Sequence, residues 1–353
     1  MTNIGPAEPI IEPDLPIVDA HHHLWFLRES ALTAMERQNS IVARALAPIC
    51  RRHVRYLFDE FLADIASGHN IRASVFVDSH AMYRLSGPEA MKSVGEVEFV
   101  NGVAAMAASG LAGEVRCCAG IVGGVDLRLG EAVEDVLSAH IQAGGGRYRG
   151  VRSAIAYDED SSILGIGVGV PHMLLDAAFR RGFERLHQFG LSFDAWLFEP
   201  QLPELIEISR DFPETQIILN HVGTPLGVGR YAGQREERFP VWRKHIKTLS
   251  SCGNVAVKLG GLGLPFGVFN SYDGASAPTS WQLASKWKPY IETCIEAFGA
   301  NRCMFESNFP VDSAACSYAV LWNAFKRIAT GASKEEKTWL FSETAKRVYR
   351  LNI

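Results

Sequence analysis

The chain has 353 residues, of which 47% are hydrophobic, and a formal net charge of -4 at pH 7. This length fits one large α/β domain or two ordinary domains, and the slight negative charge argues against a nucleic-acid or anionic-membrane partner. No apolar run approaches the roughly 20 residues that span a membrane. The polar, proline-rich residues 1–14 do not resemble a signal peptide.

Seven cysteines, an odd number, are scattered along the chain without paired spacing. Cys117 and Cys118 are adjacent in an apolar run and are interpreted as buried thiols. This usage fits a reducing cytoplasm. We therefore expect a cytoplasmic enzyme with a small-molecule substrate, either alone or as a homo- or hetero-oligomer.

Short apolar, β-rich runs alternate with longer amphipathic segments from end to end. Strands are predicted in the stretch 17–25 and at 71–78, 115–122, 148–153, 191–196, 216–220, 255–259 and 303–305. Helices are predicted at 57–66, 96–108, 131–143, 174–189, 281–298, 319–329 and 334–349, with another opened by Pro203. A basic segment, 26–53, is predicted to be an irregular insertion, and 158–171 and 223–233 are predicted loops.

Eight strands, each followed by a helix, favour a single (β/α)₈ barrel of the α/β class over residues 1–353, with 1–14 as an N-terminal extension. A doubly wound open sheet is the alternative, but no G-x-G-x-x-G follows any strand to bind a dinucleotide. In a barrel the reacting groups gather at the C-terminal ends of the strands. Residues at those ends are therefore the candidates for function.

The first strand ends in three consecutive histidines. Because a strand alternates its faces, His21 and His23 point the same way and His22 points the other way. Neutral imidazoles are good ligands for divalent first-row metals. A histidine-rich loop or a tag remnant is the alternative, but a tag would not follow an ordered apolar strand. Two histidines on one face form half of a metal site.

Other strand ends carry further candidates. His221 follows the sixth strand and fits a third metal ligand, a group polarising a substrate carbonyl, or a hydrogen-bonded structural residue. Arg152 suits a carboxylate, whereas Lys258 fits a substrate ion pair or a structural pair equally well. His80 and Glu96 follow the second strand, and either fits a metal ligand. The alternative is that His80 is an ordinary loop residue and Glu96 an acid in the first turn of a helix.

The eighth strand places Glu306 and Asn308 on one face by alternation. A carboxylate inside the barrel is costly unless it is paired or bound to metal. The alternative is a buried ion pair of Glu306 with Arg149 or Lys258. Trp25, directly after the histidines, is a candidate for an apolar pocket wall.

With these residues in place, the chain resembles the amidohydrolase-related TIM-barrel family, in the branch that contains lactone hydrolases. The resemblance covers nearly the whole chain. It consists of Asp-x-His-x-His at 19–23, Gly-Val-Arg at 150–152, Asn-His-x-Gly-x-Pro at 220–225, the Lys258 strand, and Phe-x-Ser-x-x-Pro at 305–310.

The resemblance implies that His21, His23 and His221 surround a divalent metal or the substrate carbonyl. In the family an aspartate of the last strand then activates water, within Gly-Ser-Asp-Trp-Pro. Here the position of the aspartate is Asn308 and the position of the glycine is Glu306. An amide cannot accept a proton at neutral pH, so Asn308 cannot be the base.

Together these observations predict a metal-dependent hydrolase of a lactone, ester or amide bond in a small, carboxylated substrate. The expected ligands of one or two divalent ions (Zn, Mn or Fe) are His21, His23, His221 and Glu306, with His80 and Glu96 near a second ion. The expected catalytic groups are Glu306 as base, His221, and Asp312 in reserve. The expected substrate contacts are Arg152, Lys258, Asn308 and Trp25.

Two alternatives remain open at this stage. A deeper carboxylate at Glu306 also fits a dinuclear non-haem iron oxygenase on the same barrel. The missing aspartate also fits a catalytically inactive barrel retained as a partner subunit.

Overall fold

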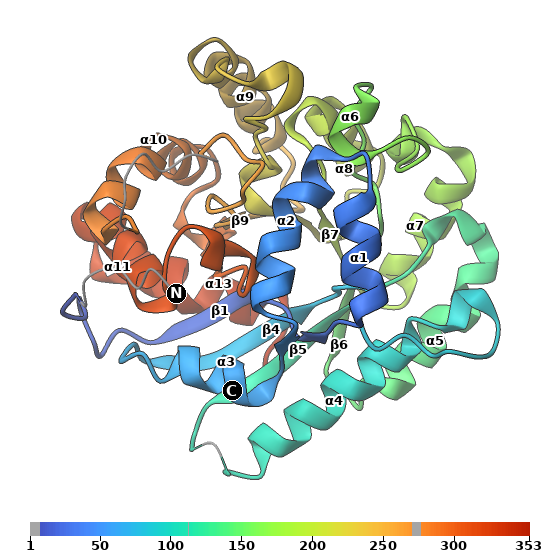
Figure 1. The fold of residues 1–353 in the computed structure, drawn as a ribbon, viewed down its shortest axis with the longest axis horizontal. Helices are drawn as coiled ribbons and strands as arrows, with labels where there is room; N and C mark the ends of the chain where they lie inside the picture. The colour runs from blue at the N-terminus through green and yellow to red at the C-terminus, as the bar shows by residue number, and fades with distance from the viewer. Residues whose placement is uncertain (1–7, 112, 270–276) are drawn as a thin grey trace.

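The computed structural model describes residues 8–111, 113–269 and 277–353. Within these ranges, eight parallel strands follow one another in a single sheet in chain order (Figure 1). They are β1 (Ile17–His22), β4 (Ile71–Val77), β5 (Arg116–Gly124), β6 (Tyr148–Arg152), β7 (Ser192–Ala195), β8 (Ile217–Leu219), β9 (Val255–Leu259) and β10 (Cys303–Phe305). Beyond β10, Phe309 bridges to His22, and its carbonyl accepts the N–H of His23 at 2.8 Å. The sheet is therefore a nearly closed barrel, as predicted.

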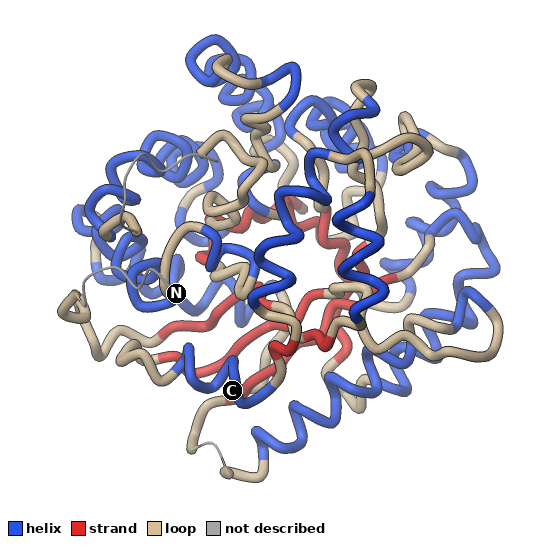
Figure 2. The backbone as a smooth tube through the Cα atoms, viewed as in Figure 1, coloured by secondary structure: helices blue, strands red, loops and turns tan. Residues whose placement is uncertain are grey.

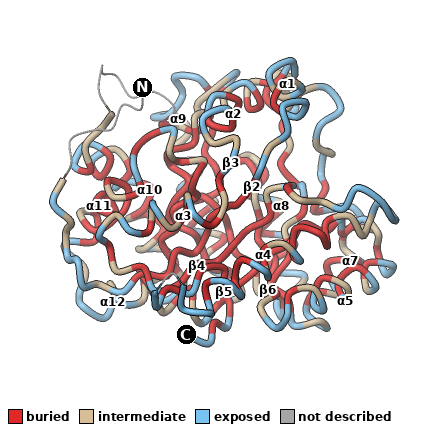
Figure 3. The backbone as a smooth tube through the Cα atoms, turned by 60° about the horizontal axis from the view of Figure 1, so that its bottom comes forward, coloured by how far each residue is buried: buried red, intermediate tan, exposed pale blue. Residues whose placement is uncertain are grey.

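Helices surround the strands (Figure 2). They are α1 (Glu29–Arg37), α2 (Ile41–Arg52), α3 (Phe58–Ile65), α4 (Val94–Ala108), α5 (Val133–Ala143), α6 (Ser161–Leu164), α7 (Ala177–Gln188), α8 (Leu202–Asp211), α9 (Arg235–Leu249), α10 (Ser280–Phe298), α11 (Tyr318–Ile328), α12 (Lys334–Thr338) and α13 (Thr344–Val348). Every residue of β1, β8, β9 and β10 is buried, because one face meets the barrel interior and the other meets the helices. Figure 3 shows the buried backbone concentrated in the middle of the molecule. None of the described helices is both long and apolar enough to cross a membrane.

The segment 26–53, predicted to be irregular, instead forms a helical hairpin of α1 and α2. Ser40 caps α2 by accepting the N–H of Ala43 at 3.1 Å, and α2 buries Val42 and Ile49 on its inner side. The prediction was wrong because the basic residues lie on the outer face and mask this amphipathic pattern. A two-stranded antiparallel pair, β2 (Trp25–Phe26) and β3 (Arg55–Tyr56), closes the base of the hairpin.

Two other predicted elements differ in detail. The predicted C-terminal helix, 334–349, is interrupted by a π-helical turn, Trp339–Glu343, between α12 and α13. The predicted loop 158–171 contains the short helix α6. Neither difference changes the order of strands and helices around the barrel.

The described part of the N-terminal extension packs against α11. Asn323 accepts the N–H of Ile11 at 2.9 Å, and the Lys326 ammonium donates to the carbonyls of Ile11 and Glu12 at 2.8 Å. Residues 1–7 lie outside the described ranges.

Candidate functional site

The three histidines at the end of β1 point in the directions that strand alternation predicts. His22 turns away from the barrel interior, stacks on Phe61 with ring centroids 3.9 Å apart, and shares a hydrogen bond with the Ser74 hydroxyl at 2.9 Å. His21 and His23 turn to the other side, where their Nε2 atoms lie 3.2 Å apart.

Backbone contacts fix the tautomer of His23. Its Nδ1 lies 2.7 Å from the carbonyl oxygen of Val77, which can only accept, so Nδ1 carries the hydrogen. The lone pair of Nε2 is then directed at His21 Nε2 and at the Asn308 side-chain oxygen, 3.3 Å away. Burial, with a smaller effect from the charge of Arg152, lowers the pKa of His23 well below its usual value. His23 is therefore a neutral imidazole with an available lone pair.

His221 follows β8 and is held by Glu306, which follows β10. Its Nδ1 lies 2.7 Å from Glu306 Oε1, and its backbone N–H donates to the same oxygen at 3.2 Å. A carboxylate accepts hydrogen bonds, so Nδ1 of His221 carries a hydrogen and Nε2 keeps its lone pair. A carboxylate behind an imidazole fixes the orientation of the ring and raises its basicity.

Glu306 also reaches His21, so one carboxylate contacts two imidazoles. Its Oε2 is 2.9 Å from His21 Nδ1 without hydrogen-bond geometry, and the Lys258 ammonium lies 3.2 Å from the same nitrogen. Burial first, and then the charge of Lys258, lower the pKa of His21 well below its usual value. His21, His221 and Glu306 form a buried group whose possible ligand atoms lie within 4.8 Å of one another, the candidate metal group of the described residues.

Lys258 lies inside the barrel rather than at a cavity. Its ammonium is 2.6 Å from the Asp194 carboxylate, and both side chains are fully buried. Asp194 also accepts hydrogen bonds from Asn220 and Tyr349, each at 2.9 Å. The structural pairing weighed for Lys258 is thus the arrangement observed.

Asn308 faces the histidines, and Asp312 holds it there. The amide nitrogen of Asn308 donates to Asp312 Oδ1 at 2.8 Å, and the N–H of Gly263 donates to the other carboxyl oxygen at 3.0 Å. Burial raises the pKa of the Asp312 carboxyl to about 8. Asp312 is therefore placed behind Asn308, as a group that orients the amide.

The structure does not bring His80 and Glu96 into the candidate metal group. Glu96 accepts the backbone N–H of Ala81 at 2.8 Å and secures the loop after β4, and burial together with the charge of Asp78 raises its pKa. The His80 side chain is 65% exposed, with Nδ1 3.1 Å from the Tyr83 hydroxyl. His80 therefore contributes to a cavity wall instead.

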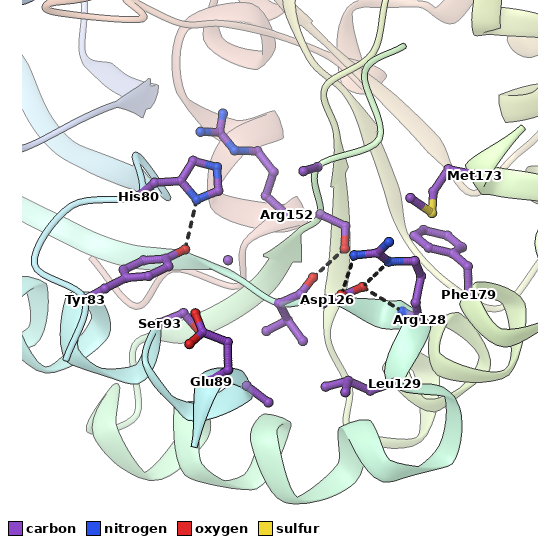
Figure 4. A pocket seen from close by; sticks show the side chains of 15 residues that line it. His80, Tyr83, Glu89, Ser93, Asp126, Arg128, Leu129, Arg152, Met173 and Phe179 are labelled. Carbon is purple, nitrogen blue, oxygen red and sulfur yellow. Dashed lines mark hydrogen bonds and ion pairs between the residues drawn. The ribbon is translucent and has the colours of Figure 1, made fainter. Parts of the chain in front are cut away.

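A cavity of about 280 Å³ opens at the carboxyl ends of the strands. His23, His221 and Asn308 line it, together with Trp25 and Arg152. Arg152 donates one hydrogen bond to the carbonyl of Asp78, and its Nε lies 3.7 Å from the carboxylate of Asp78. Arg152 lines this cavity and also a second one, which Figure 4 shows.

The backbone is unusual where it carries these side chains. His80, His221, Val222, Thr224 and Asn308 have φ values between 43° and 57°. Non-glycine residues in this region, especially β-branched ones, cost of the order of 1–3 kcal/mol each and concentrate at functional sites. The local geometry at these strand ends is therefore enforced by the surrounding fold.

Two glycines after β9 belong to the site, although the sequence analysis did not single them out. A Cβ on Gly261, at φ 64°, would overlap the His221 ring, and a Cβ on Gly260 would overlap the Glu306 side chain. Consecutive glycines directly after a predicted barrel strand were the available signal. They allow the His221–Glu306 pair to sit close against the backbone.

The chain as a whole has counterparts among known proteins. Residues 18–351 match the family model described as amidohydrolase. The chain belongs to the amidohydrolase family. It is 33% identical over 339 residues to the uncharacterized protein y4mH of Sinorhizobium fredii, covering 96% of this chain and 99% of that protein. An L-fucono-1,5-lactonase of Burkholderia multivorans is 27% identical over 240 residues, which are 66% of this chain and 72% of the lactonase.

Solved structures share the fold of this amidohydrolase. A Burkholderia multivorans amidohydrolase with bound zinc aligns with a TM-score of 0.69 at 24% identity, covering 95% of this chain and 99% of that one. A 5-carboxyvanillate decarboxylase of Novosphingobium aromaticivorans, complexed with manganese, aligns with a TM-score of 0.59 at 13% identity, covering 99% and 100%. These alignments agree with a single barrel fold that includes nearly all of the described residues.

Proposed function

We propose that this amidohydrolase is a metal-dependent hydrolase that opens a lactone, ester or amide bond in a small, carboxylated substrate. One observation carries the proposal: the Nε2 atoms of His21 and His23 and the amide oxygen of Asn308 converge beside a cavity that Arg152 also lines. The lactonase among the relatives and the zinc in a structural neighbour support the reaction class and the type of ion.

We place the ion at Nε2 of His21 and His23, next to Asn308. These two nitrogens lie 3.2 Å apart, close enough for both to hold one zinc ion. The opposite side of His21 is less suitable, because the Lys258 ammonium lies 3.2 Å from Nδ1 and repels a cation. Glu306 then accepts the Nδ1 hydrogen of His221 and is not itself a ligand.

An ion bound there supplies Lewis-acid polarisation of the substrate carbonyl and a lowered pKa for water. His221 accepts the proton at Nε2, because Glu306 holds the hydrogen on Nδ1 and stabilises the imidazolium that forms. Arg152 binds the substrate carboxylate with N–H groups that Asp78 leaves free. Asp312 accepts a hydrogen bond from the Asn308 amide nitrogen and so keeps the amide oxygen directed at His23.

His23→Gln and His221→Gln, a matched pair of cavity-lining histidine substitutions, test this placement. We expect H23Q to lose most of its zinc. We expect H221Q to retain zinc but to lose at least about 100-fold in kcat on a lactone panel, the size of a general-base effect. Metal atoms per chain are measured by elemental analysis, with the exposed His172→Gln as control.

The opposite pattern would contradict the roles assigned here. Zinc retained in H23Q and lost in H221Q would place the ion among His21, His221 and Glu306 and remove His221 as the base. About two metals per chain with iron among them, and turnover that requires oxygen, would replace hydrolysis by oxygenation. No metal and no turnover in the unmodified protein would favour an inactive barrel.

A further inference from the structure

We infer that the substrate carries an aromatic ring or an alkyl group beside the bond that is cut, rather than a row of hydroxyl groups. This inference rests on the proposed function, since it concerns the substrate of the same cavity. The feature that carries it is an apolar wall, defined as Trp25, Met35, Leu46, Trp196, Leu264 and Phe266. The wall lines the same cavity as His23 and His221.

Three polar groups in and beside this wall already donate hydrogen bonds to backbone carbonyls. The Trp25 indole N–H donates to the carbonyl of His53 at 2.6 Å, and the Ser79 hydroxyl donates to the carbonyl of Leu24 at 3.2 Å. The Ser153 hydroxyl also donates to a backbone carbonyl. Substrate hydroxyls against this wall would be buried without partners, which is unfavourable. An apolar group loses no hydrogen bonds in this position, and the burial of its surface is favourable.

The helical hairpin of α1 and α2 supplies Met35 and Leu46 of the wall and extends it. A second cavity, of about 480 Å³, shares Met35, Leu46 and Trp196 with the first. It continues between the hairpin and the loop after β6, along Ala43 and Leu164. There is thus apolar space for a group larger than one ring.

Another cavity that Arg152 lines carries charged side chains as well as apolar ones. Figure 4 shows Arg128 paired with Asp126, at 2.7 Å, and His80 hydrogen-bonded to Tyr83. Arg152 therefore lines both the cavity with the apolar wall and a cavity that contains the Arg128–Asp126 pair. This placement directs the carboxylate of the substrate to Arg152 and the apolar group toward the hairpin.

Three lactones with the same six-membered ring test the inference in the unmodified, metal-loaded protein. δ-Valerolactone has no side group, δ-nonalactone carries a butyl group, and D-glucono-1,5-lactone carries hydroxyl groups. We expect kcat/KM for δ-nonalactone to exceed that for δ-valerolactone at least about tenfold, since each buried methylene contributes to discrimination. We expect D-glucono-1,5-lactone to be at least about tenfold poorer than δ-valerolactone.

Met35→Gln, a substitution of similar size, should reduce the ratio of kcat/KM for δ-nonalactone to kcat/KM for δ-valerolactone. Leu46→Asn provides a second variant if the first does not fold. Met106→Gln, on an exposed methionine of α4, is the matched control and should leave the ratio unchanged. Calorimetric titration with 3-phenylpropanoate and with gluconate gives a readout independent of turnover.

The outcomes separate the inference from the proposed function. Equal turnover of D-glucono-1,5-lactone and δ-nonalactone would overturn the inference while leaving a lactone hydrolase. Gluconate binding as tightly as 3-phenylpropanoate would also overturn it. No lactone turnover, with binding of 3-phenylpropanoate and not of gluconate, would overturn the hydrolase and support the inferred ligand class.

Discussion

A lysine can be buried inside the barrel only because its charge is paired and its carboxylate partner is fully hydrogen-bonded. Lys258 and Asp194 are both fully buried, 2.6 Å apart, and the carboxylate also accepts hydrogen bonds from Asn220 and Tyr349. Removing one partner of such a pair leaves an uncompensated charge in a region without water, which costs about 3–5 kcal/mol.

We therefore expect Lys258→Met to lower the free energy of unfolding by about 3–5 kcal/mol, as measured by urea denaturation. The double variant K258M/D194N should recover part of this loss, because its remaining amide is neutral. A K258M protein as stable as the unmodified one would show that Asp194 does not depend on Lys258 for its charge.

At the scale of the element, the α1–α2 hairpin is attached to the barrel at both ends. The Ser40 hydroxyl accepts the N–H of Ala43 and donates to the carbonyl of Ile163 at 3.0 Å. At the other end, His53 shares a hydrogen bond with the Ser313 hydroxyl at 2.9 Å. These attachments make the hairpin a fixed part of the cavity wall.

Ser40→Ala should lower the free energy of unfolding by about 1–2 kcal/mol, because it removes a helix cap and leaves the Ile163 carbonyl without its donor. We also expect trypsin to cleave faster at Arg44, Arg51 or Arg52 in the hairpin. Ser251→Ala, on an exposed serine, is the control for both measurements. Unchanged cleavage and stability in S40A would mean that packing alone holds the hairpin.

For the whole molecule, buried neutral histidines away from the metal site determine part of the response to acid. Burial lowers the pKa of both His140 and His69 to about 4. The unfolded chain takes up these protons near pH 6.5, whereas the folded chain takes them up near pH 4. Between those values the unfolded state binds more protons, so stability falls as the pH falls.

We expect the free energy of unfolding to decrease by up to about 1.4 kcal/mol per pH unit for each such histidine between pH 6.5 and 4. His140→Gln, which lacks the titrating group, should show a shallower decrease between pH 7.5 and 5 in urea denaturation. The exposed His172→Gln should keep the slope of the unmodified protein. Equal slopes in all three proteins would exclude His140 as a contributor.

The order of strands and helices could be predicted from the sequence because it depends on local patterns. Apolar runs such as Val255–Leu259 are buried on both faces in the barrel, and the helices between them have one apolar side. The division of His21, His22 and His23 between two faces also follows from the pleat of a single strand. The hairpin was missed, since its inward residues are interrupted by arginines and a proline.

The partners of the site residues were decided only by the tertiary structure. Strand alternation directs Glu306 into the barrel, but nothing near it in the sequence indicates that it contacts His21 and His221, which lie 285 and 85 residues away. Likewise, Lys258 could have faced substrate or Asp194 until the strands were closed into a barrel. A strand's own residues determine which way a side chain points, whereas the neighbouring strands and their register determine what it meets. The sequence therefore determined the barrel and the histidine pair, and the closure of the barrel determined how those histidines are held.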